Sequence, residues 1–189
     1  MPTDSPRGAA SDAPAPAPSS KHEQVDRILR AWEMIVPTET VGASEEKLSK
    51  LIIRTAVHAK LRWSREERLH FLDSLLATQA VYRECIKRMG NAYGFNVSED
   101  PEVLLRWCQL LVRHNCQDDA PVIERYLVSQ AQDRDSVAVW RAAVEKGRQE
   151  IRWKFIVRDI WQLAKQSLDA DLRLEVESIL DKGQCLGPF

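Results

Sequence analysis

One stretch of the sequence, residues 86–130, sets the tightest limits on the fold. It contains two helix starts in which aspartate comes shortly before proline, at Asp100-Pro101 and at Asp118-Asp119-Ala120-Pro121. An aspartate side chain can accept hydrogen bonds from the free N–H groups of a first helical turn, and proline fits there because that turn needs no donor. Apolar residues at three-and-four spacing follow each start. The stretch therefore predicts the end of one helix followed by two more.

The same spacing extends over most of the chain. Ser64 and Glu67 have the spacing of a capping box, and Gly183 closes the last apolar run. Expected helices cover approximately residues 21–36, 44–59, 64–76, 79–92, 100–111, 118–130, 136–147, 151–164 and 169–182.

Two helices carry predicted core faces that the structure can test. On the helix opened by Ser64, the predicted buried residues are Leu69, Leu72, Leu75 and Leu76. On the helix from residue 151, they are Ile151, Phe155, Ile156, Ile160, Trp161, Leu163 and Ala164. Most of the six tryptophans should pack between helices, and one or two exposed ones would mark a partner surface.

These patterns predict an all-α protein. No segment alternates polar and apolar residues as a strand does, and the connections are short and polar. We expect about nine antiparallel helices stacked in an armadillo- or HEAT-like solenoid. A closed irregular bundle is the alternative architecture, because the sequence has no strict repeat period. Residues 1–20, rich in proline and alanine, are predicted to be a disordered tail, residues 21–183 the helical-repeat domain, and residues 184–189 a frayed C-terminal tail.

Charge and apolar content argue against several classes of protein. The 27 basic and 28 acidic residues give a net charge of -1, which argues against nucleic-acid and membrane-surface binding, since both need a field of one sign. No apolar run reaches the length of a bilayer, and the first residues lack the apolar core of a signal peptide. The four cysteines form no Cys-x-x-Cys pair. We therefore expect a cytoplasmic protein with reduced core thiols.

The chain offers no convincing metal or catalytic site. Its nearest approach to a zinc motif is His22-Glu23-Gln24-Val25-Asp26, which lacks the second histidine and a third ligand and is predicted to be an exposed helix start. Cys108, His114 and Cys116 lack a fourth ligand at zinc spacing. We expect no metal, no cofactor and no catalytic residue.

The stretch around residues 86–130 resembles the C-terminal helical domain of the leukotriene A4 hydrolase and aminopeptidase B family of zinc aminopeptidases. The likeness covers roughly residues 64–130. It extends along the Ile86–Met89 run, Phe95 and Glu102, and then Leu110, Ala120 and Gln130. Its signature positions are Lys87, Arg88, Tyr93, Asn96, Arg106, Trp107, Asp119 and Pro121.

The resemblance implies an armadillo-like helical stack that covers the active site of a zinc aminopeptidase. In that family a Gly-Arg-x-Lys segment after the matched region binds the substrate's carboxylate. A gapless register places Ala131, Gln132 and Arg134 there, and a register with an insertion places Gly147, Arg148 and Glu150 there. Only Arg134 and Arg148 carry over as carboxylate-binding residues. The family's His-Glu-x-x-His zinc motif does not occur in this sequence.

Three functions follow as expectations. The first is a non-catalytic helical-repeat module that binds a protein partner. The second is an accessory subunit that completes a separate zinc aminopeptidase chain in trans. The third is an RNA-associated scaffold, because Arg62-Trp63-Ser64-Arg65 and Arg152-Trp153-Lys154-Phe155 place bases beside aromatic residues.

Overall fold

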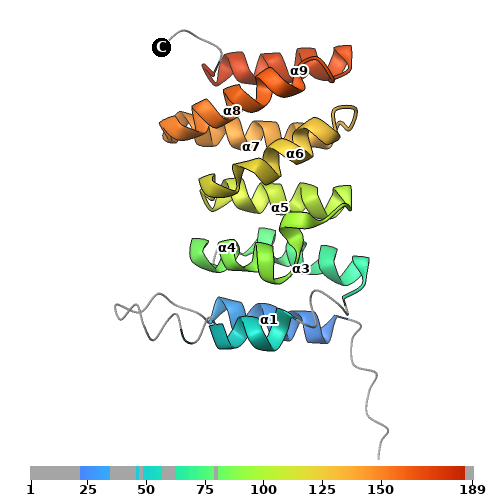
Figure 1. Ribbon diagram of the computed structural model, residues 1–189, viewed down its shortest axis with the longest axis vertical. Coiled ribbons are helices and arrows are strands. Elements are labelled where there is room, and N and C mark those ends of the chain that lie inside the picture. Colours follow the sequence, from blue (N-terminus) through green and yellow to red (C-terminus); the bar gives the residue numbers. More distant parts are fainter. Residues whose placement is uncertain (1–21, 35–45, 47–48, 57–62, 79–80, 186–189) are drawn as a thin grey trace, which may run out of the picture.

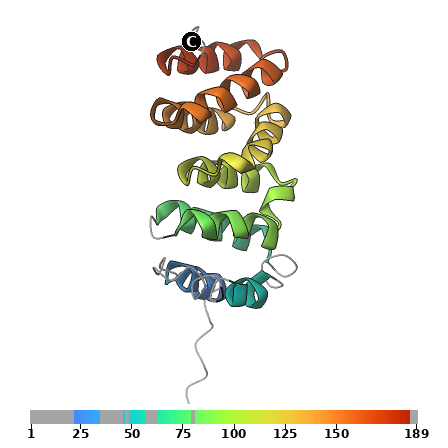
Figure 2. The same cartoon turned by 60° about the vertical axis from the view of Figure 1, so that its left-hand side comes forward.

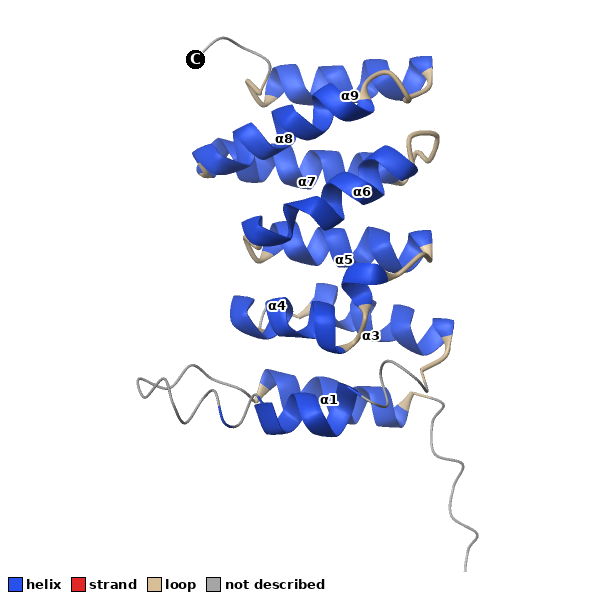
Figure 3. Ribbon diagram, in the orientation of Figure 1, coloured by secondary structure: helices blue, strands red, loops and turns tan. Residues whose placement is uncertain are grey.

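All the regular structure in the described part of the chain is helical. The computed structural model describes residues 22–34, 46, 49–56, 63–78 and 81–185. Within these ranges it contains α-helices and two 3₁₀ turns and no strand (Figure 3). The helices lie in layers along one long axis, from α1 at one end to α9 at the other (Figure 1). The predicted all-α stack is confirmed.

The helices follow the predicted order with shifted ends. They are α1 (Glu23–Glu33), α3 (Arg65–Ala77), α4 (Arg83–Ala92), α5 (Pro101–Arg113), α6 (Ala120–Ser129), α7 (Ser136–Gln149), α8 (Ile151–Ala164) and α9 (Ala170–Lys182). The 3₁₀ turns are Phe95–Val97 and Gln117–Asp119. Residues 49–56, between α1 and α3, are also helical. The predicted tail at residues 1–20 lies outside the described residues.

One row of the stack consists of α3, α5, α7 and α9, each packed on the next. Helices α6 and α8 pack on each other in the second row, and the two rows separate in the turned view of Figure 2. Arg65, at the start of α3, bonds to Asp100, at the start of α5. Arg113, at the end of α5, donates to the carbonyl of Leu76, near the end of α3. Neighbours in this row therefore run parallel, with their C-terminal ends along the same edge.

Three of the predicted helix starts are confirmed in atomic detail. The Ser64 hydroxyl accepts from the N–H of Glu67 at 3.2 Å, and the Glu67 carboxylate accepts from the N–H of Ser64 at 2.8 Å. Asp100 accepts from the N–H groups of the second and third residues of α5 at 3.0 and 3.2 Å. Asp169 accepts from the N–H of Leu172 at 2.8 Å. Each bond satisfies a donor that the first turn leaves free.

Other predicted ends are wrong. Neither Asp119 nor Asp135 makes a side-chain cap, since a 3₁₀ turn leads into α6 and a helical turn leads into α7. Helix α4 begins at Arg83 rather than at residue 79, and Tyr82 precedes it in an extended conformation. Helix α7 continues through Gly147 to Gln149.

The predicted core face of α8 is confirmed in part. Ile160, Trp161 and Ala164 are buried as predicted, and Ile156 is partly buried. Ile151, Phe155 and Leu163 are instead 60, 40 and 56% exposed, and Trp153 and Val157 complete the buried face. In α3, Phe71 is fully buried, whereas Leu69 and Leu76 are only partly buried.

All six tryptophans are buried, so none of them marks an exposed partner surface. Trp63, Phe71 and Tyr93 pack with ring centroids 4.9–5.8 Å apart. Phe95 then connects this group to Trp107 at 5.1 Å. These contacts join α3, α4 and α5 into one continuous core.

All four cysteines are buried and unpaired. Burial raises the pKa of Cys85 and of Cys116 to about 11, and it raises the pKa of Cys108 further. Cys185 lies just after α9, and its N–H donates to the carbonyl of Leu180. Within the described residues, no helix combines the length and the apolar composition that crossing a bilayer requires.

Candidate interaction surface

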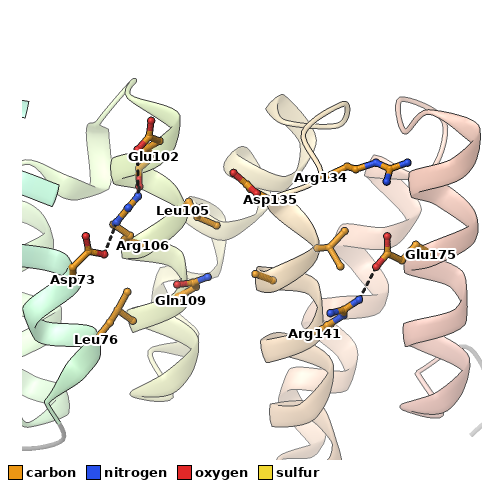
Figure 4. A pocket seen from close by; sticks show the side chains of 12 residues that line it. Asp73, Leu76, Glu102, Leu105, Arg106, Gln109, Arg134, Asp135, Arg141 and Glu175 are labelled. Atoms are coloured by element: carbon orange, nitrogen blue, oxygen red, sulfur yellow. Dashed lines mark hydrogen bonds and ion pairs between the residues drawn. The ribbon is translucent and has the colours of Figure 1, made fainter.

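The parallel row of α3, α5, α7 and α9 carries a series of cavities. The first, of about 590 Å³, opens between α5 and α7 (Figure 4). It is lined mainly by charged and amide side chains near the N-terminal ends of α5 and α7. The principal lining residues are Asp73, Glu102, Arg106, Gln109, Arg134, Asp135, Arg141 and Glu175.

Ion pairs occupy most of the charged groups in this first cavity. The Arg106 guanidinium lies 2.6 Å from the Asp73 carboxylate and 3.6 Å from that of Glu102. On the opposite wall, Arg141 lies 2.6 Å from Glu175. Figure 4 shows these pairs on facing helices with the cavity between them. Arg106 therefore pairs with Glu102, which lies one helical turn earlier on α5, and more closely with Asp73 on α3.

Two further cavities continue the first along the same row. The second, of about 510 Å³, lies between the C-terminal halves of α5 and α7 and shares Leu76, Gln109 and Ala138 with the first. The third, of about 500 Å³, lies between α7 and α9 and shares Arg141 and Glu175 with the first. We call the residues that line the three cavities the groove face. Because the cavities share lining residues, the groove face is continuous across four helices.

Arg134 and Arg148 both lie on the groove face, but in different cavities. Arg134 lines the first cavity; its side chain is 77% exposed and 3.9 Å from Asp171. Arg148 lines the third cavity, 2.7 Å from the carboxylate of Glu145, and it also donates to the carbonyl of Lys182. The structure does not bring the two arginines together in one cavity.

The comparisons with known proteins agree with this architecture. A protein-family model described as the C-terminal domain of leukotriene A4 hydrolase matches residues 63–172, more than half of the chain. The chain belongs to this family. Neither a search of curated proteins nor a search of solved structures found a match. The family match extends from Trp63 into α9 and therefore includes parts of all four helices of the groove face.

Several of the signature positions predicted from the sequence meet in one polar network around Asn96. The Trp107 indole donates to the side-chain oxygen of Asn96 at 2.7 Å. The Asn96 amide donates to Asn91 at 3.0 Å and lies 3.5 Å from Asp119, and Arg125 donates to the Asn96 carbonyl at 2.6 Å. Burial raises the pKa of Asp119. These residues hold α4, α5 and α6 together.

Tyr93, another signature position, joins the first layer to the rest of the stack. Its hydroxyl accepts from the Trp32 indole at 2.7 Å and hydrogen-bonds to the Thr55 hydroxyl. Burial raises the pKa of Tyr93 to about 12, so the phenol stays protonated. Lys87 pairs with Asp118 at 2.8 Å, and this hydrogen bond raises the pKa of Lys87.

The two remaining signature positions have simpler environments. Arg88 is partly buried on α4. Pro121 is exposed in the first turn of α6, where it leaves no donor unsatisfied.

The two candidate metal-ligand segments have other roles in the structure. His22 is partly buried rather than fully exposed, and its ring stacks on His70 at 4.3 Å. His70 in turn lies 2.7 Å from the carboxylate of Asp26. Cys108 and Cys116 are buried, with their sulfur atoms nearest to backbone carbonyls. No group of three histidine, cysteine or acidic side chains in the described ranges is arranged to hold a metal ion.

Sequence reasoning missed most of the groove face. Gln109, Ala138 and Ala142 line its centre, yet each is an ordinary residue of an amphipathic helix. One signal was present in the sequence. Ala138 and Ala142 are four residues apart, so they place two small side chains one turn apart on the same side of α7.

Proposed function

We propose that this chain is a non-catalytic helical-repeat module that binds a protein partner through the groove face. The observation that carries the proposal is the continuity of three cavities across α3, α5, α7 and α9. Stacked helix pairs create extended surfaces of this kind, which suit an elongated segment of a partner. As the sequence predicts, we place this role in the cytoplasm.

The interior of the stack supports a scaffold role. Hydrogen bonds between helices use the polar groups of Asn96, Tyr93 and Trp107. The polar groups on the groove face, in contrast, lie at the surface, where a partner can reach them. Asn96, Tyr93 and Trp107 therefore hold the stack together, and the groove face is free to supply the contacts with a partner.

A substitution that fills the groove tests the proposal. Ala138 is exposed on α7 and lines both the first and the second cavity, so Ala138→Arg fills the groove with a residue that favours helix. Gln162→Arg is the matched control, because it adds the same charge to α8 at an exposed position that lines none of the three cavities. Partners captured by the wild-type chain should be lost with Ala138→Arg and kept with Gln162→Arg. Equal capture by all three chains would refute the role of the groove face.

The family membership favours a second candidate, an accessory subunit that completes a zinc aminopeptidase in trans. In this case the captured partner would be a chain with an intact His-Glu-x-x-His motif. Adding the wild-type chain to that partner should then raise the rate of hydrolysis of aminoacyl substrates. Arg134→Ala and Arg148→Ala should reduce this stimulation. No change in rate on addition would exclude this candidate.

RNA binding receives less support. The tryptophans of the two basic-aromatic runs, Trp63 and Trp153, are 7 and 0% exposed. Neither ring offers a face on which a base could stack. The third aromatic residue of these runs, Phe155, is 40% exposed, but the guanidinium of Arg158 lies over its ring at 5.1 Å. We therefore do not extend the proposal to RNA.

A further inference from the structure

The two ends of the groove face differ in how their cations are neutralised. In the first cavity, Arg106 and Arg141 each have a carboxylate within 2.6 Å, and Arg134 has one at 3.9 Å. This end lies at the N-terminal ends of α5 and α7. The opposite end, formed by the C-terminal ends of α5, α7 and α9, follows a different pattern.

Three cations at this C-terminal end have no carboxylate partner within the described ranges. Arg113 donates to the carbonyl of Leu76, a neutral acceptor. The ammonium groups of Lys146 and Lys182 make no hydrogen bond or ion pair with any residue that the structure describes. The carboxylates that line the second and third cavities belong to Glu145 and Glu175, which already pair with arginines at 2.7 and 2.6 Å.

His114 provides a second indication that positive charge gathers here. Burial lowers its pKa, and the nearby charges of Arg113 and Lys146 lower the pKa further. The last residue of α5 and a residue in the last turn of α7 therefore contribute to one electropositive region.

Helix dipoles alone do not account for this charge. A helix C-terminus carries a partial charge of about −0.5, and cations near it are stabilised. The C-terminal ends of α3, α5, α7 and α9 therefore supply about −2 against three full positive charges. The side chains that line the second and third cavities comprise five cations and two carboxylates, so positive charge is in excess beside these open cavities.

The floor of the second cavity is apolar. Val112 is 2% exposed, Leu76 is partly buried, and Ala138 and Ala142 leave space above them. A ligand that matches this cavity combines negative side chains at the rim with small apolar side chains below.

From these observations we infer that the C-terminal end of the groove face binds an extended acidic segment of a partner protein. Aspartate or glutamate side chains of the segment pair with Arg113, Lys146 and Lys182, and its intervening apolar side chains lie over Ala138 and Ala142. The inference rests on the proposed function and specifies the chemistry of the partner.

A defined peptide tests it. The probe is a fluorescein-labelled twelve-residue peptide in which glutamate alternates with alanine or leucine, and the control peptide has glutamine for every glutamate. Fluorescence anisotropy with the full chain should show binding of the glutamate peptide about tenfold tighter at low salt, since several exposed ion pairs, each weak by itself, act together. High salt should remove most of the difference.

Charge reversal locates the site. Lys146→Glu combined with Lys182→Glu should abolish the preference for the glutamate peptide. Lys165→Glu combined with Arg173→Glu changes the net charge equally at positions that line none of the three cavities, and it should preserve the preference. Thermal unfolding monitors the fold of each variant. Lys146→Gln removes only one charge and should weaken the preference for the glutamate peptide. This milder variant replaces the double variant in the test if the double variant does not fold.

Two outcomes would overturn the inference. One is equal binding of the glutamate and glutamine peptides, and the other is equal loss of preference in the two double variants. Neither outcome bears on partner capture through Ala138, so the inference can fail while the proposed function stands.

Discussion

At the scale of single residues, the stability of this protein depends on a few polar groups at helix interfaces. Asn96 is the clearest case, because this partly buried residue hydrogen-bonds through its side chain and carbonyl to α4, α5 and α6. Such a network favours one arrangement of helices, since another would leave donors or acceptors unpaired.

A pair of tryptophan substitutions tests the value of this network. Both Trp107 and Trp140 are fully buried, but the Trp107 indole donates to Asn96 whereas the Trp140 indole has no partner in the described ranges. Trp107→Phe leaves the oxygen of Asn96 unsatisfied, and Trp140→Phe removes a donor that is already unsatisfied. We expect Trp107→Phe to lower the free energy of unfolding by about 1 kcal/mol more than Trp140→Phe does. Urea denaturation measures both, and equal losses would show that the network contributes nothing.

Asp100 predicts a specific dependence of stability on pH. Partial burial raises its pKa, but the N–H of Val103 and the guanidinium of Arg65 outweigh this effect and hold the pKa of Asp100 below its usual range. A lowered pKa in the folded state means that the stabilisation is fully present above the unfolded pKa of about 4 and is lost as the pH falls through the folded pKa.

Asp100→Asn isolates this contribution, because asparagine still caps a helix but carries no charge. The variant should be less stable than the wild type at pH 7, and the difference should narrow on acidification to about pH 3. Urea denaturation across this range checks it. Other carboxylates titrate equally in both proteins, so a constant difference would contradict the role assigned to Asp100.

At the scale of elements, two glycines within helices are expected to respond in opposite ways to the same substitution. A β-carbon at Gly90 would lie 2.5–2.8 Å from side-chain atoms of Asn96, which Trp107 holds in place. A β-carbon at Gly147 would lie 3.4 Å from its nearest neighbours, atoms of Lys154, an ordinary contact.

Gly90→Ala should therefore destabilise the protein by about 1–3 kcal/mol, the usual cost of overpacking. Gly147→Ala should stabilise it by about 0.5–1 kcal/mol, because alanine loses less backbone entropy in a helix. Thermal unfolding of the two variants gives the signs. Stabilisation by Gly90→Ala would mean that Asn96 can move aside without cost.

Helix α8 shows where sequence reasoning stops. The starts of α3, α5 and α9 were predictable because capping is local, with donor and acceptor two or three residues apart. Helix α8 carries apolar residues on several sides, so the stripe through Ile151 and Phe155 and the stripe through Trp153 and Val157 fit the same spacing. Only packing against α6 and α7 chooses between the two stripes.

The groove face could not be predicted from the sequence for a related reason. Its lining residues come from four helices separated by many residues, and none has an unusual chemistry in its own helix. The sequence predicted Arg134 and Arg148 only through the family resemblance. Their separation into two cavities depends on the packing of α7 on α9, which periodicity alone does not determine.

At the scale of the whole molecule, the stack is linear, and each layer contacts mainly its neighbours. Stability in such architectures is approximately the sum of the layers and of the interfaces between them. Two hydrogen bonds to Tyr93, from Trp32 and Thr55, attach the first layer, and α1 also packs on α3, where His70 contacts Asp26 and His22. This end should therefore open on its own.

Tyr93→Phe tests this independence. Loss of the hydroxyl removes two hydrogen bonds and should weaken the attachment of α1 and residues 49–56 by about 1 kcal/mol. Amide hydrogen exchange in these segments should accelerate about fivefold, while exchange in α7 and α9 should stay unchanged. Uniform acceleration along the chain would indicate that the stack unfolds as a single cooperative unit.

The buried thiols make this layered behaviour observable without any substitution. Cys85, Cys108, Cys116 and Cys185 lie at different heights of the stack, and burial keeps each one protonated and inaccessible. A thiol-specific reagent can modify each cysteine only when its surroundings open. The labelling rate of each of the four thiols therefore reports how often its own part of the stack opens. The order in which they are labelled would show the order in which the stack opens between α4 and the end of α9.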